Sequence, residues 1–316
     1  MEAGYDKVKL WIDRAIVGGQ YPTIADYLDS AKEQIDKQTG EVKTFGRVKG
    51  VKVSISAGGL SIIGSLPKFL FGSNVYPLNK CAAAQALEKL ADTLHIQVGE
   101  AVVTGIEFGA NYLMKRPVAE YLSKLGTMPR FHRLQITDYS IRYEGKGKGK
   151  TRPKVFAFYD KIADAAAKRM EYPEGLENLL RYEIRLNGRL PYQLSVPEVK
   201  ASTLTKPDFH RQMVKYYQDS YFSISKSNQI KTDVMNDNRT PNAVFEVLEA
   251  MLINQNPSFI EEFLVKVKQA GVFTDRKYYS RLKAMIKKKG SKANITISDD
   301  LIKELDDEIK NSGAYV

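Results

Sequence analysis

Val155-Phe156-Ala157-Phe158-Tyr159-Asp160-Lys161 and Leu180-Arg181-Tyr182-Glu183-Ile184-Arg185-Leu186 decide the fold, because each segment has the composition of a β-strand. Side chains two apart on a strand share a face. Arg181, Glu183 and Arg185 therefore point one way, with apolar residues and Tyr182 on the other face. A lone carboxylate between two guanidinium groups is typical of anion and metal chemistry. A plain salt-bridge ladder explains the same spacing equally well.

Alternating strands and amphipathic helices share the first 230 residues. Strands are expected at residues 6–14, 42–45, 51–55, 60–63, 102–111, 130–144, 154–160 and 179–187. Helices are expected at residues 22–37, 79–94, 117–126 and 162–170, with a rigid loop at 64–74. A Gly/Lys loop between two strands predicts a long hairpin, which favours antiparallel pairing. The sequence thus predicts an α+β fold with a mixed, largely antiparallel sheet.

The character of the chain changes near residue 231. Four helices are expected after a turn-rich break, at residues 242–254, 257–270, 275–289 and 298–310. We therefore predict a domain over 1–230, with a β-rich part at 1–75 and a catalytic part at 76–230. A helical C-terminal domain is predicted over 231–316.

The composition indicates a globular chain of 316 residues with 43% hydrophobic and 27% charged residues. The single cysteine, Cys81, excludes an intramolecular disulfide, and its Ala-rich helical surroundings predict a buried thiol. No apolar run approaches about 18 residues, and the N-terminus lacks the pattern of a signal peptide. A cytoplasmic protein without a membrane partner is expected.

The charge balance favours an acidic partner, because 48 Lys and Arg outnumber 37 Asp and Glu. Two stretches concentrate the cations without an acid among them. One runs from 276 to 292, and the other comprises Lys146, Lys148, Lys150, Arg152 and Lys154. Such clusters are typical of proteins that bind a phosphate backbone, and a solvated surface is the alternative.

The chain lacks the residues that several classes of enzyme require. No phosphate-binding loop is present, and three scattered histidines give no metal-ligand or hydrolase pattern. A carboxylate site remains, with Glu107 and Glu183 as single acids in apolar strands and Asp160 as a third candidate ligand for Mg²⁺ or Mn²⁺. Pairing of each acid with an adjacent arginine is the alternative.

Tyr159 is a candidate nucleophile on residue chemistry. A tyrosine of pKa about 10 needs nearby cations or a metal to favour its phenolate. Tyr159 is followed closely by Lys161 and lies downstream of the loop cations. With 18 tyrosines in the chain, a place in the core is the ordinary alternative.

Four motifs together resemble phage and plasmid replication proteins, namely the filamentous-phage initiators and, more distantly, those of staphylococcal rolling-circle plasmids. The motifs are Lys7-Val8-Lys9-Leu10-Trp11-Ile12-Asp13, Gly64-Ser65-Leu66-Pro67-Lys68-Phe69 with Gly72 and Asn74, Phe158-Tyr159-Asp160-Lys161 and Arg181-Tyr182-Glu183-Ile184-Arg185-Leu186. The likeness covers residues 5–220. It implies a rolling-circle replication initiator that nicks one strand of an origin, stays attached through a 5′-phosphotyrosine and later rejoins the ends.

The resemblance also implies roles for residues. Tyr159 matches the phage nucleophile, and the plasmid relatives point instead to Tyr143. Glu183 and Glu107 are the implied metal ligands, although the relatives often carry Arg and Asp where this chain has Gly105-Ile106-Glu107. The expected cations that stabilise charge developing on the scissile phosphate are Arg181, Arg185 and Lys161.

The expected partner is DNA, as a double-stranded origin and as the displaced single strand. The Gly/Lys hairpin and Arg181 would hold the backbone, and the helix carrying Arg281 and Lys288 would read the origin. A host helicase and a second copy of the chain are further candidate partners. The alternative function is a non-catalytic origin-binding factor that recruits host enzymes. An RNA-binding protein is disfavoured, because no aromatic stacking signature is present.

Overall fold

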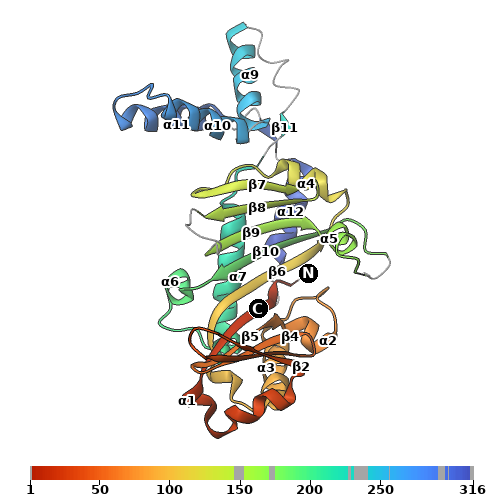
Figure 1. The fold of residues 1–316 in the computed structure, drawn as a ribbon. Helices are drawn as coiled ribbons and strands as arrows, with labels where there is room; N and C mark the ends of the chain where they lie inside the picture. The colour runs from red at the N-terminus through yellow and green to blue at the C-terminus, as the bar shows by residue number, and fades with distance from the viewer. Residues whose placement is uncertain are drawn as a thin grey trace.

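A ten-stranded antiparallel sheet forms the centre of the molecule (Figure 1). The computed structural model describes residues 2–145, 153–170, 175–226, 229–230, 241–255, 257–290, 296–297 and 299–313. The strands follow the order β2-β3-β4-β5-β1-β6-β10-β9-β8-β7 across the sheet. With its helical C-terminal part, the protein has the mixed α+β fold, with a largely antiparallel sheet, that the sequence predicts.

The N-terminal strand lies in the middle of the sheet, between β5 and β6. The first five strands are β1 (Gly4–Asp13), β2 (Asp29–Ile35), β3 (Val42–Val48), β4 (Val51–Ser56) and β5 (Gly59–Ser65). The other five are β6 (Val102–Leu113), β7 (Phe131–Thr137), β8 (Ser140–Gly145), β9 (Lys154–Asp160) and β10 (Leu179–Asn187). The parts predicted at 1–75 and 76–230 therefore contribute to one continuous sheet.

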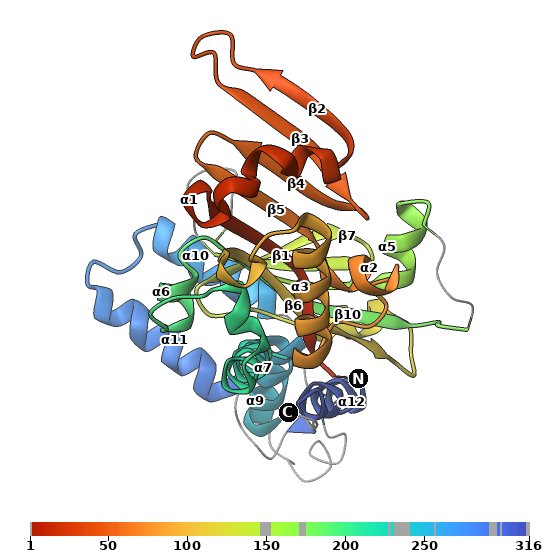
Figure 2. The same ribbon diagram turned by 90° about the horizontal axis from the view of Figure 1, so that it is seen from below.

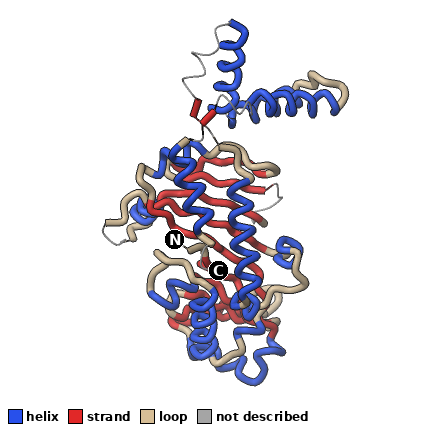
Figure 3. Tube along the Cα trace, turned by 180° about the vertical axis from the view of Figure 1, so that it is seen from behind, coloured by secondary structure: helices blue, strands red, loops and turns tan. Residues whose placement is uncertain are grey.

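Helices cover one face of this sheet and leave much of the other face open (Figure 1, Figure 3). The main covering helices are α3 (Lys80–Leu94), α4 (Val118–Lys124), α7 (Pro207–Phe222) and α12 (Asp300–Asn311). Their apolar side chains bury Val8, Leu10 and Ile12 from β1 and Tyr182 and Ile184 from β10 in one core. The opposite face is therefore the one that leaves strand side chains accessible.

The expected helix at 22–37 is wrong. A 3₁₀ segment, η1 (Gly18–Tyr27), contains Pro22, and the chain then enters β2 as an exposed edge strand. Pro22 is compatible with the first turn of a helix, so it does not explain the difference; pairing of β2 with β3 outweighs the weak apolar periodicity of the segment. Figure 2 shows β2 and β3 at the far edge of the sheet.

Two other expectations near the first long helix also differ. The predicted loop at 64–74 contains the short helix α2 (Leu66–Phe71), which Ser65 caps and Pro67 starts. Asn79 caps α3 as expected, but Cys81 in its first turn is exposed rather than buried. The buried side of α3 carries Ala83, Ala86 and Leu90 instead.

The remaining short helices connect the strands. They are α1 (Arg14–Val17), η2 (Val98–Glu100), α5 (Lys161–Ala167), α6 (Leu190–Leu194) and η3 (Ala201–Thr205). Within the residues described, no helix has both the length and the apolar character that spanning a membrane requires.

The C-terminal part divides in two. Between the short paired strands β11 (Gln229–Ile230) and β12 (Thr296–Ile297) stand α9 (Pro241–Gln255), α10 (Pro257–Gln269) and α11 (Arg276–Gly290). These helices extend away from the sheet (Figure 1). The last helix, α12, instead buries Leu305 and Ile309 in the main core. The described residues after 231 are mainly helical, as predicted, but the final helix packs with the sheet.

Candidate active site

A cavity of about 410 Å³ lies on the open face at the centre of the sheet. Residues from β1, β4, β5, β6, β9, β10, α2 and α5 line it. The lining includes Asp6, Glu107, Tyr159, Lys161, Glu183 and Arg185. Because β6 and β10 are neighbours, Glu107 and Glu183 face the same cavity, as the sequence predicts if their strands adjoin.

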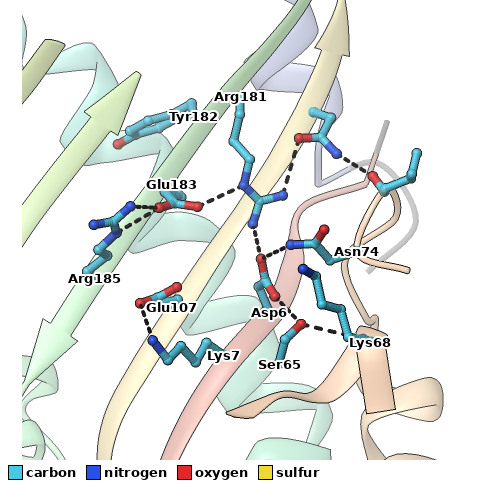
Figure 4. Close-up of polar contacts among 12 residues, drawn as sticks. Asp6, Lys7, Ser65, Lys68, Asn74, Glu107, Arg181, Tyr182, Glu183 and Arg185 are labelled. Atoms are coloured by element: carbon cyan, nitrogen blue, oxygen red, sulfur yellow. Dashed lines mark hydrogen bonds and ion pairs between the residues drawn. The ribbon is translucent and has the colours of Figure 1, made fainter. Parts of the chain in front are cut away.

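Glu183 is the fixed centre of the cavity (Figure 4). Its Oε2 accepts a hydrogen bond from Arg181 Nε at 2.8 Å, and its Oε1 accepts from Arg185 Nε at 2.7 Å and from Arg185 Nη2. Gly109 lies opposite Glu183 on β6, where a Cβ atom would come within 2.8 Å of Glu183 Cα. Although burial opposes ionisation, the two guanidinium groups lower the pKa of Glu183 to about 2.

Tyr159 brings its hydroxyl to this carboxylate. It lies across from Arg181 in the β9–β10 register, and its hydroxyl donates to Glu183 Oε2 at 3.2 Å. Burial and the charge of Glu183 hold the pKa of Tyr159 well above its usual value of 10. Tyr159 is therefore a neutral phenol at rest, aimed into the cavity by strand geometry.

Arg181 anchors the site to the N-terminal strand. Its side chain is fully buried, with Nη2 donating to Asp6 Oδ2 at 2.7 Å and Nη1 donating to Asn111 Oδ1 at 3.2 Å. Asp6 also accepts from Ser65 Oγ at 2.6 Å and from Asn74 Nδ2 at 3.2 Å. Three of the four motifs of the resemblance thus meet in one hydrogen-bond network, which includes Asn74 of the second motif. Two further members, Asp6 and Asn111, were not predicted from the sequence.

Lys161 completes the cavity at the start of α5. Its side chain is 7% exposed, and Nζ lies 5.9 Å from the centroid of the Tyr159 ring. Burial, followed by the nearby Arg181 charge, lowers the pKa of Lys161 to about 8. A neutral amine is therefore accessible near the tyrosine at mildly alkaline pH.

The predicted set of three carboxylate ligands does not fit a metal ion as arranged. An ionised carboxylate has about four acceptor positions, and Glu183 already accepts four hydrogen bonds, from Arg181, Arg185 and Tyr159. Asp160 instead caps α5, accepting from the backbone N–H groups of Ile162 and Ala163. Among the described residues, no three His, Cys, Asp or Glu side chains are grouped as a metal site.

Glu107 is the acid that retains capacity for a cation. Its carboxylate lies 3.8 Å from Lys7 Nζ and is partly exposed in the cavity. Burial, followed by the charge of Glu183, raises the pKa of Glu107 above its ordinary value. One carboxylate, together with phosphate oxygens and water, suffices for Mg²⁺. Of the three predicted ligands, Glu107 is thus the one whose surroundings suit a divalent ion. The other ligands of that ion would be water and oxygens of the substrate phosphate.

Tyr143 lies on the other side of the sheet. It is opposite Phe156 on the helix-covered face, fully buried, and its hydroxyl donates to the backbone oxygen of Gly126 at 2.8 Å. Burial raises the pKa of Tyr143. Tyr143 and the cavity acids therefore lie on different faces, and of the two candidate nucleophiles only Tyr159 reaches Glu183.

The predicted DNA contacts are dispersed. Arg181 is buried in the network described above and offers no surface for DNA. Lys154 Nζ lies over the ring of Tyr216 on α7, on the helix-covered face. Arg281 and Lys288 are exposed on α11, away from the cavity. Lys146, Lys148, Lys150 and Arg152 lie outside the described residues.

Comparisons with known proteins assign no family. No protein-family description matches the chain, and no curated protein matches it. One solved structure that matches is the crystal structure of the di-domain ARO/CYC BexL from the BE-7585A biosynthetic pathway. It shares 10% identity over 70% of this chain and 96% of its own, with a TM-score of 0.22. A likeness at this level carries no argument about fold or function.

Proposed function

We propose that the protein is a rolling-circle replication initiator, a DNA-nicking and rejoining enzyme that uses Tyr159 as its nucleophile. The observation that carries the proposal is the hydrogen bond from Tyr159 to Glu183 inside a cavity lined by Arg185 and Lys161. A phenol, a proton acceptor and fixed cations are the groups that transfer of a phosphoryl group to tyrosine requires.

The arrangement of these groups supports the following reaction. The Tyr159 oxygen attacks the scissile phosphorus, forming a phosphorus–tyrosine bond as the bond to the 3′ oxygen breaks. The 5′ phosphate stays on the enzyme, and the 3′ oxygen takes up a proton to become a free hydroxyl. Attack by that hydroxyl on the phosphotyrosine reverses the step and rejoins the strand.

Lys161 is the better proton acceptor of the two groups beside Tyr159. With a pKa of about 2, Glu183 accepts the hydrogen bond and orients the phenol, but it is too weak a base to take the proton at neutral pH. The pKa of Lys161, lowered to about 8, gives a neutral amine that matches this task.

Arg185 supplies positive charge at the cavity. Its side chain is 28% exposed, whereas that of Arg181 is fully buried. Arg185 can therefore contact a bound phosphate while it holds Glu183, and Arg181 supports Glu183 from behind. A divalent ion held by Glu107 and phosphate oxygens would further polarise the scissile phosphate.

A non-catalytic origin-binding factor is the second candidate. The exposed cations of α11, including Arg281 and Lys288, favour it, because they stand on helices that extend away from the sheet. Binding through α11 alone would need no chemistry in the cavity.

Incubation with supercoiled DNA of the protein's own replicon and Mn²⁺ distinguishes the two functions. The initiator predicts nicked circles carrying covalent protein on a denaturing gel, absent with Tyr159→Phe and retained with Tyr143→Phe. Tight binding with no nick, on single-stranded DNA as well, would reject the enzyme and leave the origin-binding factor.

A further inference from the structure

We propose that the open face formed by β1, β3, β4 and β5 is a binding track for single-stranded DNA, continuous with the cavity around Tyr159. The inference rests on the proposed function and names the path of the strand that the enzyme would hold. It is carried by the strand register, which brings two complementary rows of side chains onto this face.

The first row, here called the cationic row, crosses the sheet at right angles to the strands. Arg47 on β3 lies opposite Lys52 on β4, which lies opposite Ile63 on β5, which lies opposite Lys9 on β1. Arg47 and Lys52 are exposed. Lys9 donates to Asn187 at 2.7 Å, which links the row to β10. An acid, Asp29, lies opposite Arg47 at the outer end of the row.

The second row, here called the stacking row, runs parallel to the first and two residues along each strand. Phe45 on β3 lies opposite Ser54, Ser54 opposite Ser61, and Ser61 opposite Trp11 on β1. Two residues along a strand correspond to about 6.7 Å. Aromatic rings beside hydroxyls, next to a line of cations, are what unpaired bases and their phosphates bind.

The surface along these rows is hollow. A second cavity of about 510 Å³ is lined by Phe45, Arg47, Ser54 and Ser61 from the two rows. It shares Lys52 and Ile63 with the cavity around Tyr159. The two hollows therefore form one path across the sheet, and Lys52 stands at their junction.

The dimensions suit a short single strand. Six strand spacings separate β9, which carries Tyr159, from β3, which carries Arg47. At about 4.8 Å each the path is roughly 29 Å long, enough for several nucleotides. Stacking on Phe45 and Trp11 requires bases free of their partners, so the track favours single-stranded over duplex DNA.

Tryptophan fluorescence gives a direct test, because Trp11 is the only tryptophan in the chain. Unlabelled oligo-dT is added to the Tyr159→Phe protein, which cannot cleave, and emission is followed to saturation. The track predicts quenching of Trp11 by the single strand and much weaker quenching by duplex DNA of equal length. Binding without quenching, or equal quenching by duplex, would overturn the proposal.

Charge-matched variants give a second test by fluorescence anisotropy with labelled oligo-dT. Arg47→Gln/Lys52→Gln should weaken binding at least about tenfold and reduce the salt slope of log K by about 1.4, or 0.7 for each lost phosphate contact. The control is Arg211→Gln/Lys215→Gln on α7, which lies on the opposite side of the sheet. Equal effects of the two double variants would overturn the track.

Different experimental outcomes reject the track and the proposed nicking reaction. Nicking without Trp11 quenching or variant effects would reject only the track. Quenching and variant effects without any nick would keep the track and reject the enzyme.

Discussion

Tyr159 and Glu183, on the neighbouring strands β9 and β10, are joined by a hydrogen bond of 3.2 Å from the phenol to the carboxylate. Glu183 cannot turn away, because Arg181 and Arg185 hold both of its oxygens. The phenol is thereby held at one place in the cavity. Positioning of a nucleophile before substrate arrives lowers the entropic part of the barrier, so this contact is central to the proposed reaction.

Glu183→Gln should destabilise the fold strongly. The substitution leaves the fully buried Arg181 with Asp6 as its one carboxylate partner in the described network, and breaking a buried ion pair from one side costs about 3–5 kcal/mol. Urea unfolding at pH 7 measures the loss. Glu100→Gln is the control, since its ion pair with Lys200 is solvent-exposed and contributes little to stability. Equal losses for the two variants would contradict the network.

The lowered pKa of Glu183 predicts that the protein loses stability in acid. The folded-state pKa of Glu183, about 2, lies below its ordinary value of 4.5. Its contribution to stability is therefore full above pH 4.5 and lost as pH falls from 4.5 to 2. The shift corresponds to on the order of 3 kcal/mol. Unfolding free energies measured over this range should fall less steeply in Glu183→Gln than in the wild type.

The rate of covalent attachment should rise with pH and level off above about 8. The pKa of Lys161 is lowered to about 8, and the neutral amine that accepts the tyrosine proton predominates above this value. Lys161→Arg keeps the positive charge and removes the base. It should slow attachment about 100-fold and abolish the inflection. Single-turnover rates from pH 6 to 10 provide the measurement, and an unchanged profile in the variant would exclude Lys161 as the base.

Glu107→Gln should weaken the proposed binding of a divalent ion while leaving the fold intact. Glu107 is the cavity acid with capacity for a cation, and its ion-pair partner, Lys7, is 3.8 Å away and partly exposed. We expect the Mn²⁺ concentration for half-maximal nicking to rise by more than about tenfold. Calorimetric titration of Mn²⁺ into the protein–DNA complex checks binding independently of turnover. Unaltered Mn²⁺ affinity would remove Glu107 from the metal site.

Tyr143→Phe should affect stability and not chemistry. The substitution removes the buried hydrogen bond from the Tyr143 hydroxyl to the backbone of Gly126. Such a bond contributes about 1 kcal/mol to the free energy of unfolding. Thermal unfolding should show this modest loss, and nicking should match the wild type. A nicking defect without a stability defect would contradict the assignment of Tyr143 to the core.

Strand periodicity predicted much of the site from sequence. Because side chains alternate, Arg181, Glu183 and Arg185 share a face, and Tyr159 and Glu183 could be proposed for one site. Once β8 pairs with β9, the register puts Tyr143 opposite Phe156 and hence on the far face. The sequence alone does not fix that register, because the connecting loop leaves it open.

Long-range pairing explains what the sequence could not predict. Asp6 joins Arg181 across 175 positions of the chain, because β1 enters the sheet between β5 and β6. No local pattern specifies that insertion. The cause differs for β2, whose apolar residues have helical spacing but which pairs with the next strand along the chain, β3. In β2, local propensity yields to strand pairing.

The most direct test of the account is the identity of the residue bound to DNA. The protein is incubated with an oligonucleotide carrying the nick site and Mn²⁺, digested with trypsin and nuclease, and analysed by mass spectrometry. The account predicts a nucleotide on the peptide containing Tyr159 and none on the peptide containing Tyr143. A nucleotide attached to any other residue, or no covalent product although DNA is cleaved, would contradict it.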